Sequence, residues 1–235
     1  MPIELRWPTT IRPASCSFKI ATRTVYGASP LRKARRAFGS VVDQWTAKLS
    51  WERLPPDLWM PLDGMISRVD GPLGTIRMWD AARSHPFGMA AGLNVETAMS
   101  LGIGSPFSDG TYFTDGKGWL DVSAYGFVAT SVEAGSEFLS IGGLVPNQPV
   151  SLLGGDLFEV GGYLYKAGMT AASDANGFAT VTIRPRLRTT VLDGDSVLFA
   201  FPTSPFQLAD DEQGAFEIVS PMDGSIGLSL VEVLP

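Results

Sequence analysis

The sequence contains very little cysteine and histidine, on which many metal sites and catalytic centres depend. Its 235 residues include one Cys, Cys16, and one His, His85. A single Cys forms no disulfide within the chain and no cysteine-based metal site. A single His cannot supply the several imidazoles of a typical zinc site. We therefore expect neither a bound metal nor another cofactor.

Long apolar runs and positive charge are also scarce. No run of about 18 apolar residues exists, so we expect no membrane-inserted segment. The N-terminus, MPIELRWPTT, lacks the basic-then-apolar pattern of a signal peptide, which predicts a protein made in the cytoplasm. The net charge of −6 argues against a dedicated nucleic-acid binder, because such proteins are usually basic. Charged residues make up 18% of the chain, below the roughly 25% of soluble domains, which favours a surface partly covered by neighbours.

Glycine and proline, by contrast, are spread along the whole chain between short alternating segments, which predicts a mostly β protein with many turns. The clearest stretch is residues 156–188. There Gly161-Gly162 supplies the two positive-φ residues of a tight hairpin turn between strands at 157–160 and 163–167. Asn176-Gly177 marks a second turn. Apolar and polar residues then alternate over 179–184, as in a half-buried strand.

The first half of the sequence predicts a hairpin followed by one helix. Strands at 17–25 and 41–51 pair across a long connection, and the second places Trp45, Ala47, Leu49 and Trp51 on one face. A helix is predicted at 57–70 from the helical spacing of its apolar residues. Pro61 and Gly64 argue against it, but Pro61 would cost little if the helix began there. Further strands are expected at 74–79, 125–132, 196–201, 206–209, 215–219 and 225–234.

Two segments are candidate contact surfaces. The basic cluster Arg32, Lys33, Arg35 and Arg36 is either an interface or a solvated loop. Residues 88–124 form a long Gly-rich stretch, and loops of this length are usually functional or packed on a neighbour. Its aromatic residues are candidates for a protein interface or, alternatively, for sugar binding: Tyr112, Phe113 and Trp119.

Catalytic patterns are missing from the sequence. It contains no GxSxG, HExxH or P-loop motif. His85 fits a surface loop, and Cys16 fits a small core or edge position. A glycosidase needs only two carboxylates, but the candidate Asp residues stand in turn sequences, where Asp bonds to its own backbone. These candidates are Asp109, Asp115, Asp156, Asp174, Asp193 and Asp195. We predict that the protein is not an enzyme.

One stretch of sequence carries a family resemblance. It runs Gly-Asp-Leu-Phe-Glu-Val-Gly-Gly-Tyr-Leu-Tyr-Lys from Gly155, then Gly-Phe-Ala-Thr-Val-Thr-Ile-Arg-Pro-Arg-Leu-Arg from Gly177, then Asp193-Gly194-Asp195. This pattern resembles the distal-tail or minor-tail proteins of long-tailed bacteriophages and related gene transfer agents. Phe206-Gln207-Leu208, the C-terminal strand and the Pro86-Phe87-Gly88 turn stand in the order expected for that family.

The resemblance implies a tail-tube-like β-sandwich with one short helix and an inserted small β-barrel or sandwich. The sandwich would comprise residues 1–124 and 205–235, and the insert residues 125–204. Such proteins form a six-fold ring at the tail tip of the virion. The ring joins the tail-tube protein to the hub and carries side fibres or receptor-binding proteins, with no sequence-specific nucleic-acid contact. Some relatives hold a Cys-ligated iron–sulfur cluster, which a single Cys excludes here.

Two other functions remain open at this point. A stand-alone β-sandwich module would bind carbohydrate or a receptor through Tyr112, Phe113 or Trp119. A tail-associated hydrolase would lose its activity when one Asp is changed to Asn. Ring assembly distinguishes the tail-tip protein from the first of these.

Overall fold

The structure is a computed structural model and describes residues 4–8, 10–21, 24–27, 36–39, 43–69, 71–88, 125–210, 213–219 and 223–235. Within this part the chain is mostly β with one α-helix, which confirms the predicted fold class. The chain forms two compact units, Met1–Ala82 with Thr203–Pro235, and Arg83–Pro202. The sequence placed the unit boundaries at 124/125 and 204/205. Because residues 89–124 lie outside the described part, that assignment stays a prediction.

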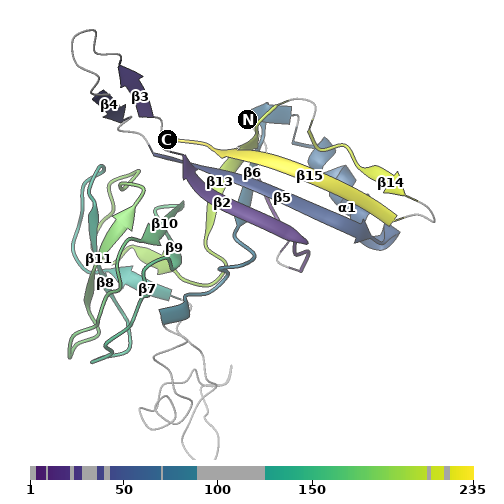
Figure 1. Cartoon of the computed structure of the whole chain (residues 1–235). Helices are drawn as coiled ribbons and strands as arrows, with labels where there is room; N and C mark the ends of the chain where they lie inside the picture. Colours follow the sequence, from purple (N-terminus) through teal and green to yellow (C-terminus); the bar gives the residue numbers. More distant parts are fainter. Residues whose placement is uncertain are drawn as a thin grey trace, which may run out of the picture. The chain divides into compact units, whose positions relative to one another are not determined.

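The first unit is built on an open, seven-stranded sheet (Figure 1). Its neighbouring strands are, in order, β1 (Glu4–Arg6), β6 (Thr75–Trp79), β13 (Thr203–Leu208), β15 (Asp223–Glu232), β5 (Gln44–Leu54) and β2 (Ser15–Ala21); β14 (Glu217–Val219) also pairs with β15. Only β1 and β6 are parallel; the other pairs are antiparallel. A second ladder, β3 (Thr24–Gly27) with β4 (Arg36–Gly39), lies in sequence between β2 and β5.

This sheet curls so that strands distant in the sheet order touch. The Phe18 and Phe206 rings are 5.8 Å apart, although β5 and β15 separate their strands. In a flat sheet three strand intervals would span about 14 Å. The ring of Trp7, just after β1, likewise packs on that of Trp51 in β5, with 4.6 Å between the ring centroids. The inner face therefore encloses a core, as in a β-sandwich.

The alternation of the long strands assigns one face to this core and the other to solvent. On β5 the predicted inward set is buried: Trp45, Ala47, Leu49 and Trp51. Ile226, Leu228 and Leu230 of β15 are buried on the same face. The opposite face of β5 and β15 carries small polar and charged side chains, including Ser50, Glu52 and Ser225. We call this the outer face.

The helix α1 (Pro56–Ser67) buries Leu62 and Ile66, and Trp59 packs against Phe216 with ring centroids 5.8 Å apart. The predicted helix, 57–70, starts one residue late, because Pro56 occupies the first turn, and ends three residues late. Pro61 consequently lies inside the helix and not at its first position. A short 3-10 helix, η1 (Gly71–Leu73), follows.

The second unit is a closed six-stranded barrel in the order β10, β11, β8, β7, β12, β9. The bounds are β7 (Tyr125–Val128), β8 (Phe138–Gly142), β9 (Leu157–Val160), β10 (Tyr163–Ala167), β11 (Ala179–Arg184) and β12 (Ser196–Leu198). β9 and β10 form the predicted hairpin, with Gly161 at φ 57° and Gly162 at φ 81°. The alternation over 179–184 is confirmed, since Ala179, Val181 and Ile183 are buried. β8 is a strand that the sequence pattern did not predict.

Candidate functional site

The side chains that the sequence predicts to contact neighbouring proteins or sugars all lie outside the described part of the structure. Arg32, Lys33 and Arg35 fall between β3 and β4, outside the described residues. Arg36 begins β4, where its backbone pairs with Gly27. Tyr112, Phe113 and Trp119 belong to residues 89–124, which also lie outside the description.

Three of the described Asp candidates, Asp156, Asp174 and Asp195, accept hydrogen bonds from backbone N–H groups. Asp174 accepts from the N–H groups of Asn176 and Phe178 at 2.8 and 2.9 Å, which is the turn chemistry expected for Asp. Asp195 accepts from Leu192 N at 2.7 Å. Asp109 and Asp115 fall outside the described residues, and Asp193 is exposed.

Asp156 has a larger structural role. Its buried carboxylate accepts hydrogen bonds from the N–H groups of Phe87, Gly88 and Leu153, at 2.8, 2.9 and 2.7 Å. Two of these donors immediately precede residues 89–124. Gly88 is required for this approach, because a Cβ there would lie 2.5 Å from Leu153 N. Asp156 thus attaches residues 87–88 to the barrel unit.

Neither Cys16 nor His85 joins a catalytic arrangement with the described residues. Cys16 Sγ donates to Asp80 Oδ1 at 3.5 Å. Burial, together with the Asp80 charge, raises the pKa of the Cys16 thiol, which disfavours the nucleophilic thiolate. His85 Nδ1 lies 3.2 Å from Ser84 Oγ, and its ring packs edge-on against Phe201. Among the described residues, no three His, Cys, Asp or Glu side chains cluster as metal ligands.

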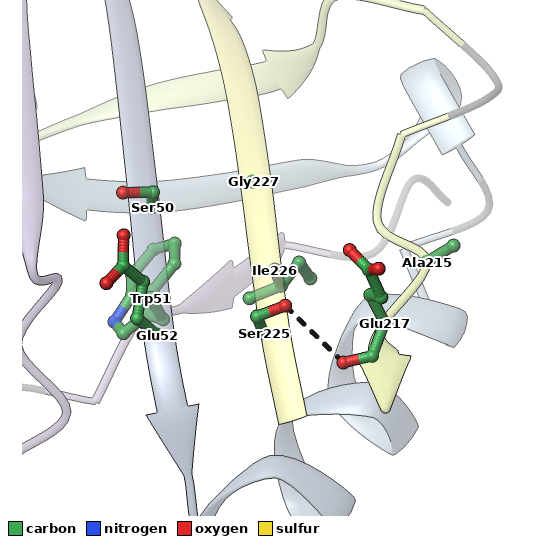
Figure 2. A pocket seen from close by; sticks show the side chains of 8 residues that line it. All are labelled: Ser50, Trp51, Glu52, Ala215, Glu217, Ser225, Ile226 and Gly227. Atoms are coloured by element: carbon green, nitrogen blue, oxygen red, sulfur yellow. Dashed lines mark hydrogen bonds between the residues drawn. The ribbon is translucent and has the colours of Figure 1, made fainter. Parts of the chain in front are cut away.

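The feature that best fits a contact site is a depression of about 290 Å³ in the first unit. Three strands and a loop position its lining residues: Ser50, Trp51, Glu52, Ala215, Glu217, Ser225, Ile226 and Gly227. Figure 2 shows Glu52 and Glu217 on opposite sides of the β15 segment that carries Ser225 and Gly227. We call this the outer-face depression.

An irregular strand pairing creates the depression. Gly224 pairs with Leu54 and Ile226 with Trp51, so Ser225 stands opposite both Glu52 and Arg53. Such a bulge re-aims the side chains of the bulged strand, and Arg53 takes φ 54° there. Gly227 leaves the floor open, because a Cβ at this position would meet nothing within 4 Å.

The depression is polar and negatively charged. Glu52 and Glu217 are its only charged lining residues, and both are exposed. Ser225 Oγ donates to the Glu217 carbonyl oxygen at 3.4 Å, and the Ser50 hydroxyl lies 2.8 Å from that of Ser15. The described ion pairs, Arg77–Glu4 and Arg186–Glu137, involve neither of the two lining carboxylates. The site can therefore accept cationic side chains.

The barrel unit exposes a separate aromatic group. Phe127 and Phe178 meet edge to face at 6.0 Å and are 38% and 37% exposed. A Cβ at Gly142 would lie 2.5 Å from Phe127 Cζ. The two rings cover the backbone of a strand glycine, which accounts for their position without a ligand.

Sequence reasoning missed both Glu52 and Glu217. Neither stands in a motif, and they lie far apart in the chain. The one available signal was the glycine at position 227 within an otherwise regular strand, since a strand glycine often marks an open or irregular site.

No protein-family model matches the chain, and no curated protein matches its sequence. In the described part of the chain, no helix has the length and apolar character needed to cross a membrane.

Proposed function

We propose that this protein is a structural subunit of a phage tail tip, which assembles into a ring between the tail tube and the hub and anchors fibres or receptor-binding proteins. The resemblance of residues 155–195 to distal-tail proteins supplies the biological setting. The proposal includes a six-fold ring of identical copies and a place in the virion.

The observation that carries the proposal is the edge strand β2 of the first unit, which no second described strand pairs with. β2 ends the seven-stranded sheet and pairs only with β5 among the described strands. It is seven residues long, and a free strand of that length presents a row of unpaired backbone groups. Soluble monomers usually shorten or cover such edges. A subunit whose neighbour covers the edge satisfies this requirement.

The combination of units also supports an assembly role. An open sheet offers edges for neighbouring copies, whereas a closed barrel inserted into it offers none. The buried carboxylate of Asp156 accepts hydrogen bonds from backbone N–H groups of the barrel unit itself. These features suit a scaffold that holds other proteins.

The proposal is tested first by the native mass of the purified full-length chain. Light scattering on a sizing column, with negative-stain images of any large peak, is expected to give ring-shaped particles of six times 25.1 kDa. Deleting the coding sequence from the genome that carries it is expected to abolish complete tails. Normal, infectious tails without this protein would contradict the proposal.

A further inference from the structure

We draw no further inference here: the strongest candidate, the patch of exposed rings on the outer face of the barrel unit, with Phe127 on β7, Phe138 on β8 and Phe178 next to β11, carries none because nothing in the structure shows what covers it.

Discussion

The two units of the protein treat the edges of their β-sheets differently. The barrel unit closes, so each of its six strands has a partner on both sides. The first unit leaves β1 and β2 at the ends of an open sheet. β1 is only three residues long, and charged Glu4 and Arg6 flank its central residue. A short strand and charged side chains both protect a sheet edge against pairing with another chain. β2 is longer, with seven residues and a single charged side chain, Lys19. In the proposed ring, a neighbouring copy would cover β2, whereas the barrel unit has no strand edge left to cover.

The two cores differ in the same way. Four fully buried tryptophans fill the first unit: Trp7, Trp45, Trp51 and Trp79. The barrel is filled by aliphatic residues and smaller rings, such as Phe158, Tyr165 and Phe199. A closed six-stranded barrel has a narrow interior, whereas a curled open sheet encloses a wider space that indole rings fill. Closure of the sheet therefore determines both whether strand edges stay unpaired and how large the side chains of the core can be.

The largest expected effects come from a matched pair of core truncations, Phe158→Ala in the barrel and Phe206→Ala in the first unit. Both rings are 0% exposed, and each change should lower the free energy of unfolding by about 3–5 kcal/mol. If the units unfold independently, each change affects only its own unit. Five of the six Trp lie in residues 1–82, so Trp fluorescence follows the first unit in urea, and amide NMR signals follow the barrel. Equal shifts of both transitions in both variants would refute independent units.

A smaller loss, about 3 kcal/mol, is expected for Glu232→Ala in the open sheet. The Glu232 carboxyl accepts from Ser204 Oγ at 2.8 Å and from Trp45 N at 3.0 Å, and is 1% exposed. Its removal leaves a buried hydroxyl and a buried N–H unsatisfied, at about 1–3 kcal/mol each. Urea unfolding by Trp fluorescence measures the change. Glu52→Ala, at an exposed carboxylate, is the control and should leave stability unchanged.

Asp156→Ala should cost about 2 kcal/mol in the barrel unit. Three backbone N–H groups lose their acceptor, but water can reach part of this site once residues 87–88 detach, so the loss is smaller than at Glu232. Hydrogen exchange at Phe87 and Gly88 should accelerate before the rest of the barrel does. Asp174→Ala removes two turn bonds elsewhere and should leave those two amides protected; unchanged exchange in Asp156→Ala would contradict the assigned role.

How far the sequence predicted this molecule depends on how local the determining interactions are. The β9–β10 hairpin was predicted to the residue because Gly161-Gly162 and its flanking alternation define it without tertiary contacts. β8 was missed because it is short and because Phe138, 56% exposed, places a large apolar residue on the outside and obscures the alternation. The helix start was shifted because two prolines, Pro56 and Pro61, competed for the first turn.

The sequence marks the outer-face depression only through Gly227 and does not predict which side chains line it. Glu52 and Glu217 become neighbours only through the separate pairings of β5 and β14 with β15. The bulge that brings Glu52 there depends on the register of a long-range ladder, which no local pattern encodes.

The smallest effect, and the only stabilising one, is expected from Gly64→Ala in the helix of the open-sheet unit. Gly64 lies inside α1, and a Cβ there would meet nothing within 4 Å. Alanine removes the entropic penalty of a helical glycine and should raise the free energy of unfolding by about 0.5–1 kcal/mol. Gly74→Ala is the control of opposite sign, because its Cβ would overlap the Val69 carbonyl oxygen. Since the gain is local to one unit, the Trp fluorescence transition should move to higher urea while the NMR transition of the barrel stays in place. A Gly64→Ala variant that shifted both transitions would show that the open-sheet unit and the barrel unit do not unfold independently.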